Sequence, residues 1–165
     1  MIPTRIPLVA GNWKMNGSAS ANAGLLDDMI PGLTAKEAPE IAICVPFPYL
    51  AQVGERIRGT RVVLGAQNAS EFASGAYTGE VSLAMLADFG CRFVIVGHSE
   101  RRAMFGETNA QVGAKARAVA AAGLVPIACV GETWPERLAG ATEAVIGAQL
   151  GGCADADQAQ VGGQR

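Results

Sequence analysis

Five short apolar stretches recur along the chain, and each is largely continuous rather than alternating with polar residues. Such runs are typical of strands that are buried on both faces of a parallel sheet. Their first residues lie 35, 21, 31 and 32 positions apart, which leaves room for one helix and two short loops between neighbours. The five predicted strands are Ile6–Ala10, Ile41–Val45, Val62–Ala66, Phe93–Val96 and Val125–Val130.

Helical signals fill the segments between the predicted strands. Apolar residues recur there at the three- and four-residue spacing of a buried helix face. Thr108 with Gln111, and Thr133 with Glu136, have the spacing of a capping box, and Gly123 is typical of a helix end. Five successive βα units predict an α/β fold around a parallel sheet.

The pattern changes after Leu150. Residues 151–165 contain four glycines and one bulky aliphatic residue, Val161, and they show neither a helical nor a strand period. We therefore expect one domain over residues 1–150 and a flexible tail over residues 151–165, with no sixth strand.

The composition predicts a compact, soluble protein of the cytoplasm. Of the 165 residues, 50% are hydrophobic and 17% are charged, which excludes a disordered chain. No apolar run approaches the roughly 18–20 residues of a membrane-spanning helix, and residues 1–5 lack the features of a secretory signal. A net charge of −2 argues against a nucleic-acid or anionic-membrane partner. The four cysteines form no CxxC pair, so we expect free thiols.

Polar side chains follow each predicted strand at its carboxyl end, where parallel α/β folds bind their ligands. The segments are Asn12-Trp13-Lys14, Pro46-Phe47-Pro48, Gln67-Asn68, Gly97-His98-Ser99-Glu100 and Gly131-Glu132. An ammonium group, an imidazole, amides and carboxylates at one rim suit a small anionic substrate and proton transfer. The glycine-rich stretch at residues 74–80 lacks the spacing of a nucleotide loop, and we expect a protruding loop that contacts another surface.

His98 is the only histidine of the chain. A lone histidine is more often a packing or capping residue, but its place between a buried strand and a polar turn favours a functional role. If Ser99 begins a helical turn, the backbone N–H groups there disfavour the imidazolium form. The neutral ring could then donate a hydrogen bond to a carbonyl group.

Lys14 is one of three lysines, and its neighbours Trp13 and Met15 suggest partial enclosure. A solvated surface lysine is the ordinary alternative, but an enclosed ammonium group would stabilise a phosphate or an enolate-like charge. For Glu100 and Glu132, a structural ion pair with nearby arginines is the simpler explanation.

Five ordered segments of the chain resemble the triosephosphate isomerase family, and the resemblance runs from about residue 6 to Leu150. They are Ala10–Asn16, Gly65–Asn68, Gly75–Ser82, Val94–Arg102 and Cys129–Glu132. The family is a (β/α)8 TIM barrel of about 250 residues. The resemblance therefore implies that this chain is the (βα)5 portion of such a barrel, incomplete, and that it ends before the sixth barrel strand.

The resemblance also implies roles for individual residues. His98 would be the neutral electrophile at the substrate carbonyl, Lys14 would stabilise negative charge, and Asn12 would help to hold the substrate. Ser99 and Glu100 would support His98. The implied reaction interconverts dihydroxyacetone phosphate and glyceraldehyde 3-phosphate through an enediolate, without cofactor or metal.

The resemblance implies a homodimer as well. Thr78, in the glycine-rich loop, resembles the family residue that reaches into the partner subunit near Asn12 and Lys14. The partners implied are thus a small phosphorylated triose and a second copy of the chain.

The sequence departs from the family after the fifth unit. The family's general-base glutamate comes after the sixth strand, and its phosphate-binding amides come after strands seven and eight. Glu100 and Glu132 match other family positions, so neither inherits the role of base. We therefore expect no activity from the 165 residues alone.

This departure leaves three hypotheses. The chain is part of an isomerase, or it is a non-catalytic fragment that acts only through association. A self-contained, doubly wound binding domain fits less well, because the motifs occur in the order of successive barrel strands.

Overall fold

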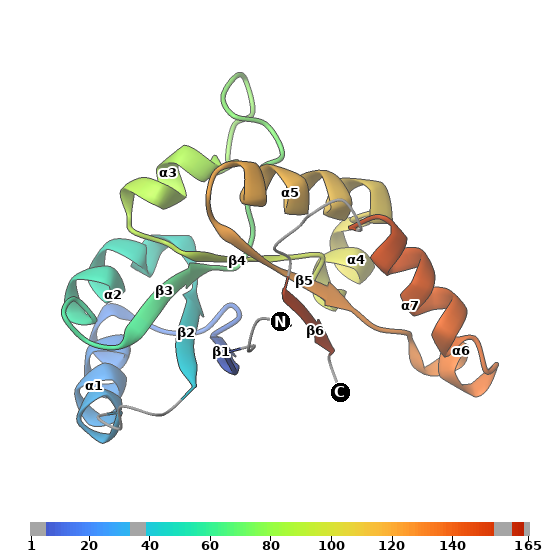
Figure 1. Ribbon diagram of the computed structural model, residues 1–165. Helices are drawn as coiled ribbons and strands as arrows, with labels where there is room; N and C mark the ends of the chain where they lie inside the picture. Colours follow the sequence, from blue (N-terminus) through green and yellow to red (C-terminus); the bar gives the residue numbers. More distant parts are fainter. Residues whose placement is uncertain (1–5, 34–38, 154–159, 164–165) are drawn as a thin grey trace, which may run out of the picture. The chain divides into compact units, whose positions relative to one another are not determined.

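The computed structural model describes residues 6–33, 39–153 and 160–163. The chain divides into two compact units. Unit 1 comprises residues 1–67 and 86–93, and unit 2 comprises residues 68–85 and 94–165. Strands and helices alternate along the chain (Figure 1), so the predicted succession of parallel βα units is confirmed. None of the helices in the described ranges is long and apolar enough to cross a membrane.

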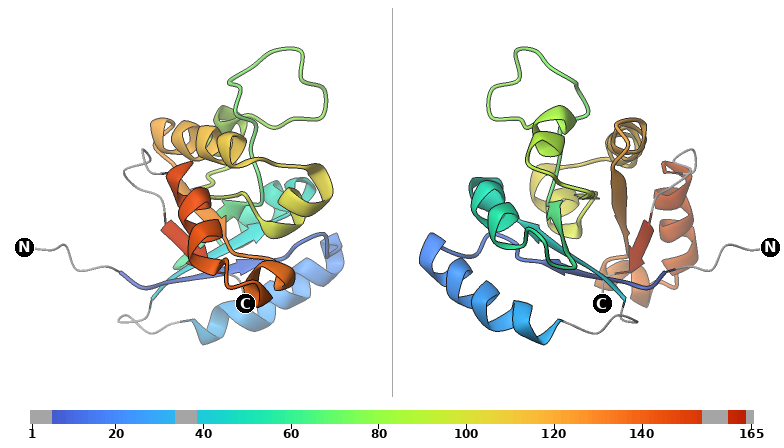
Figure 2. Two further views of the ribbon diagram at one scale, coloured as in Figure 1. Left: turned by 90° about the vertical axis from the view of Figure 1, so that its right-hand side faces the viewer. Right: turned by 60° about the vertical axis from the view of Figure 1, so that its left-hand side comes forward.

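Unit 1 contains three parallel strands in the order β1-β2-β3. Its elements are β1 (Leu8–Asn12), α1 (Ala19–Met29), β2 (Glu40–Val45), α2 (Leu50–Arg56) and β3 (Val62–Ala66), with short 3-10 turns at Ile30–Gly32 and Phe47–Tyr49. α3 (Leu83–Asp88) begins in unit 2 and ends in unit 1. The views in Figure 2 show α1 and α2 on one side of the strands.

The core of unit 1 is formed by β2 and β3 against the two helices. Cys44, Leu26 and Val53 are fully buried there, in keeping with the continuous apolar runs of the sequence. β1 differs, because Val9 is 56% exposed. β1 also begins two residues later than predicted and includes Asn12 as its last residue.

Unit 2 contains the strand order β4-β5-β6. Its elements are β4 (Phe93–Val96, of which Phe93 belongs to unit 1), α4 (Ser99–Phe105), α5 (Asn109–Ala121), β5 (Val125–Val130), α6 (Trp134–Leu138), α7 (Thr142–Gly151) and β6 (Gln160–Gly163). Val94 and Val96 of β4 are buried with Val112 and Val119 of α5.

Both predicted capping boxes are present in unit 2. The Gln111 backbone N–H donates to Thr108 Oγ1 at 3.3 Å, and the Thr108 N–H donates to Gln111 Oε1 at 3.0 Å. Thr133 and Glu136 form the same reciprocal pair at the start of α6. These signals are local, which explains why the sequence revealed them.

The expectation of no sixth strand is wrong. Residues 160–163 form β6, which pairs in parallel with β5 from Ile127↔Gln160 to Val130↔Gly163. A short strand can add to a sheet through its backbone N–H and C=O groups alone, so it need not carry an apolar run. α7 also extends to Gly151, and Cys153 is buried. Residues 154–159 and 164–165 of the expected tail, like the N-terminal residues 1–5, lie outside the described residues.

Candidate active site

The carboxyl end of β1 fixes the backbone of Lys14. Asn12 Oδ1 accepts the Lys14 backbone N–H at 3.0 Å. Gln67 Nε2 donates to the Lys14 carbonyl oxygen at 2.9 Å and to the Cys44 carbonyl oxygen at the same distance. Side-chain amides of two strand ends therefore hold the Lys14 peptide groups on both sides.

Lys14 adopts a backbone conformation that its side chain disfavours. Its φ of 52° is the one positive value of a non-glycine residue within the described ranges. A left-handed conformation costs an L-residue roughly 1–2 kcal/mol, and such strain is concentrated at functional sites. The expected enclosure by Met15 is wrong, because Met15 is 96% exposed and Lys14 is also exposed.

His98 is separated from the end of β4 by Gly97 alone and is the N-cap residue of α4. The prediction that Ser99 begins a helical turn is confirmed. The imidazole is 9% exposed, and its Nδ1 accepts the backbone N–H of Glu100 at 3.2 Å. A nitrogen that accepts a hydrogen bond carries no proton, so this geometry assigns the proton of the neutral ring to Nε2.

Glu100 Oε2 lies 3.4 Å from the same Nδ1 atom. The carboxylate would favour an imidazolium, whereas the backbone N–H requires a lone pair on Nδ1. The hydrogen bond from the Glu100 backbone N–H is fixed by the start of the helix. The Glu100 side chain is 46% exposed, so solvent screens the charge of its carboxylate. The hydrogen bond from the backbone therefore makes Nδ1 an acceptor, and the Glu100 carboxylate also lies beside the ring.

The glycine before His98 is required by its surroundings. Gly97 has φ of 69°, and a Cβ atom there would lie 2.6 Å and 2.8 Å from the two Cγ atoms of Val112. The strand can thus turn into the His98 segment only with a residue that lacks a side chain.

The loop after β5 is held by a side chain that the sequence did not indicate. Gln149, on α7, accepts the Gly131 N–H at 2.8 Å and donates to the Gly131 carbonyl oxygen at 3.0 Å. Glu132 Oε1 lies 3.4 Å from Thr142 Oγ1 and 3.6 Å from Arg137 Nε. Glu132 thus makes the structural interactions expected of it.

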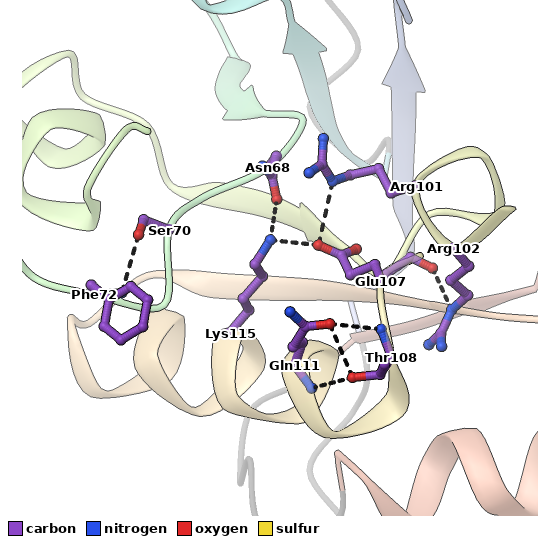
Figure 3. Close-up of polar contacts among 10 residues, drawn as sticks. Asn68, Ser70, Phe72, Arg101, Arg102, Glu107, Thr108, Gln111 and Lys115 are labelled. Carbon is purple, nitrogen blue, oxygen red and sulfur yellow. Dashed lines mark hydrogen bonds and ion pairs between the residues drawn. The ribbon is translucent and has the colours of Figure 1, made fainter. Parts of the chain in front are cut away.

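A buried ionic cluster lies beside the end of α4 (Figure 3). Glu107 accepts hydrogen bonds from Lys115 and from Arg101 Nε, and Lys115 Nζ also donates to Asn68 Oδ1 at 2.9 Å. Burial alone would raise the pKa of Glu107, but the hydrogen bonds and charges of Lys115 and Arg101 outweigh it and lower the pKa. No local sequence pattern predicts this cluster, because its members lie up to 47 residues apart in the sequence.

The glycine-rich segment forms an exposed loop within unit 2. The Ser70 N–H donates to the Val81 carbonyl oxygen at 2.8 Å and closes its base. The rings of Phe72 and Tyr77 stack with centroids 4.2 Å apart, and Thr78 is exposed. A cavity of about 230 Å³ lies between this loop and the Glu107 cluster. The predicted protrusion is visible in Figure 1.

The predicted site residues form two local groups. Asn12 and Lys14 lie together with Gln67 in unit 1, and His98, Ser99 and Glu100 lie together in unit 2. Within the described part of the chain, no group of three or more His, Cys, Asp or Glu side chains is placed to hold a metal ion.

Parallel βα units with polar groups at the carboxyl ends of their strands are typical of α/β folds, TIM barrels among them. A family model described as triosephosphate isomerase matches residues 7–162, so the chain belongs to the triosephosphate isomerase family. Its fold class is that of an incomplete TIM barrel, as the resemblance implied. The family match also includes most of β6.

Curated proteins that are similar to this chain are also triosephosphate isomerases. The chain is 58% identical over 146 residues to a triosephosphate isomerase of Thiobacillus denitrificans, covering 88% of the chain and 58% of the relative. It is 55% identical over 148 residues to one of Azoarcus sp., covering 90% and 59%. For Dechloromonas aromatica the identity is 53% over 146 residues, covering 88% and 58%. The chain thus spans somewhat less than three-fifths of the length of these curated relatives.

Proposed function

We propose that this chain contributes the carbonyl-polarising and charge-stabilising groups of a triosephosphate isomerase site. The reaction would interconvert dihydroxyacetone phosphate and glyceraldehyde 3-phosphate through an enediolate. The observation that carries the proposal is the His98 ring, buried at a helix start with Nδ1 engaged by the Glu100 N–H. In the proposed reaction, Nε2 carries the ring proton and would donate it in a hydrogen bond to a substrate carbonyl.

His98 would act as a neutral hydrogen-bond donor. As the substrate loses its carbon-bound proton, negative charge develops on the carbonyl oxygen and the bond from Nε2–H strengthens. Triosephosphate isomerases are the standard example of a neutral histidine that works with a glutamate base. Ser99 and Glu100 would support the ring through the backbone of α4.

Lys14 and Asn12 would serve the charges of the substrate. The ammonium group would stabilise both the phosphate dianion and the enediolate, and Asn12 would hold the Lys14 peptide while helping to bind the substrate. The strained φ of Lys14 supports this role, because a purely solvated lysine would have no need of it. The proposal assigns no cofactor or metal to the reaction.

The 165 residues alone are proposed to be inactive. They contain no glutamate after Glu143. Glu100 lies against His98, and Glu132 is engaged by Thr142 and Arg137. A general base contributes about 10²–10⁴-fold to a rate, so its absence would reduce turnover to background.

The exposed loop around Thr78 would dock on a second copy, which gives a homodimer. Phe72 and Tyr77 stiffen this loop by stacking, and both rings are partly exposed. The four cysteines are buried thiols rather than disulfides, which supports the proposed cytoplasmic location. Neither a nucleic acid nor a membrane is proposed as a partner.

A chimera tests the proposal. Residues 1–163 would be joined to the remaining C-terminal segment of the Thiobacillus denitrificans relative, and isomerisation would be followed in a coupled assay. We expect turnover, and we expect His98→Gln to lower kcat by about 10²–10³-fold with little change in KM. Lys14→Met should impair both kcat and KM. Arg58→Met, at a 76% exposed side chain, is the matched control for loss of a cation.

The same experiment separates the alternative function. An inactive but folded chimera, or one whose kcat is unchanged by His98→Gln, would contradict the catalytic role. It would favour a fragment that acts through association, for which the 56% exposed Val9 of β1 is the supporting observation.

A further inference from the structure

Arg102 connects three segments of unit 2 through one guanidinium group. Its Nε donates to the Gly97 carbonyl oxygen at 2.8 Å, its NH1 donates to Asn109 Oδ1 at 2.6 Å, and its NH2 lies 3.4 Å from the Cys129 carbonyl oxygen. Arg102 lies one helical turn after His98 on α4, and Figure 3 shows it beside the start of α5.

The hydrogen bond from Arg102 to Gly97 holds the peptide group that precedes the Cα atom of His98. The Gly97 carbonyl belongs to the Gly97–His98 peptide, so its direction sets where the His98 backbone begins. On the other side, the His98 carbonyl oxygen accepts the N–H groups of Arg101 at 2.8 Å and Arg102 at 3.1 Å. The His98 backbone is therefore fixed before and after its Cα atom.

The three acceptors of Arg102 come from different parts of the fold. Gly97 follows β4, Asn109 begins α5 and Cys129 belongs to β5. A planar guanidinium group offers donors in several fixed directions, whereas a lysine ammonium group is a single point on a flexible stem. The geometry requires an arginine rather than a positive charge alone.

We propose that Arg102 is a positioning residue for His98. By tying the Gly97–His98 peptide to α5 and β5, it holds the imidazole where Nδ1 meets the Glu100 N–H and where the ring proton resides on Nε2. The importance of this for catalysis rests on the proposed isomerase function, but the effect on the ring itself does not.

Nuclear magnetic resonance of the imidazole tests the proposal directly. His98 is the only histidine of the 165-residue chain, so a long-range ¹H–¹⁵N correlation spectrum of the ring contains one spin system. In the unaltered chain, at a pH where the ring is neutral, we expect the pattern of a single tautomer protonated on Nε2. In Arg102→Met and Arg102→Lys, we expect the two nitrogen shifts to move toward each other as both tautomers become populated.

Arg117→Met is the matched control. Arg117 also donates to a backbone carbonyl in unit 2, that of Gly152 at 3.2 Å, but it does not touch the His98 turn. Its ring spectrum should equal that of the unaltered chain. Asn109→Ala removes one Arg102 acceptor and keeps the others, so it provides a milder second variant should Arg102→Met not fold.

Two results would overturn the proposal. One is an unchanged Nε2-protonated pattern in folded Arg102→Lys and Asn109→Ala, and the other is an equal change in Arg117→Met. In the active chimera, Arg102→Lys should lower kcat by about 10–100-fold with little change in KM, as a misplaced catalytic group does. An inactive chimera combined with the expected tautomer shift would contradict the isomerase function and leave the positioning role supported.

Discussion

Replacing Gly113 with alanine should destabilise unit 2, although alanine is the better helix former. Gly113 is buried on α5, and a Cβ atom there would overlap the main-chain carbonyl group of Gly152, just after α7. The same carbonyl oxygen accepts the hydrogen bond from Arg117. Because the obstructing atoms belong to the backbone, the overlap can be relieved only if α5 and the end of α7 move apart.

The magnitude comes from three contributions. Overpacking of a well-packed interior costs about 1–3 kcal/mol. Separation of the two segments would also lose the hydrogen bond between Arg117 and Gly152, worth about 1 kcal/mol. The higher helix propensity of alanine relative to glycine stabilises the folded state by about 1 kcal/mol. The free energy of unfolding should therefore fall by about 1–3 kcal/mol.

Urea unfolding followed by circular dichroism measures this change, and Gly147→Ala provides the control. Gly147 lies on α7, and a Cβ atom there meets nothing within 4 Å. Its replacement should raise the free energy of unfolding by about 0.5–1 kcal/mol, because only helix propensity acts. If Gly113→Ala proves as stable as the unaltered chain while Gly147→Ala is stabilised, the reasoning about the backbone contact is refuted.

Three further predictions concern other parts of the chain. The lowered pKa of Glu107 means that its carboxylate stabilises the fold above its ordinary pKa of 4.5 and loses this effect as the pH falls through the lower folded value. Glu107→Gln should flatten that pH dependence in urea midpoints, and an unchanged slope would contradict it. Gly97→Ala should lower the free energy of unfolding by about 1–3 kcal/mol through contact with Val112, as measured by urea unfolding. Val9→Lys should reduce self-association in light scattering, whereas an unchanged mass would show that β1 is not the surface involved.

The strands inside the sheet could be predicted because burial on both faces imposes a continuous apolar sequence. Ala42, Cys44 and Val45 of β2 are all fully buried, as such a run requires. β6 could not be predicted in this way, since it is recognised by its backbone pairing with β5 rather than by its side chains.

Part of the candidate site could also be predicted from the sequence. A polar residue just after a predicted strand must lie near the strand's carboxyl end, and this placed His98 beside the end of β4 and Lys14 beside the end of β1. The positive φ of Lys14 could not be predicted, because no local residue type demands it. The hydrogen bond between Lys115 and Asn68 could not be predicted either, since it joins residues 47 positions apart in the sequence.

Three contacts that the sequence did not reveal have the same effect on the structure. Gln67 binds the Lys14 carbonyl oxygen, Arg102 binds the Gly97 carbonyl oxygen, and Gln149 binds both polar groups of the residue after β5. Each is an amide or guanidinium side chain that reaches from a neighbouring element to a peptide group at a strand's carboxyl end. Catalytic groups act best when their geometry is fixed before the substrate arrives. Each of these loops therefore gains rigidity from a side chain of another segment. Under the proposed function, a substitution at Gln67, Arg102 or Gln149 should lower kcat without removing a group that touches the substrate.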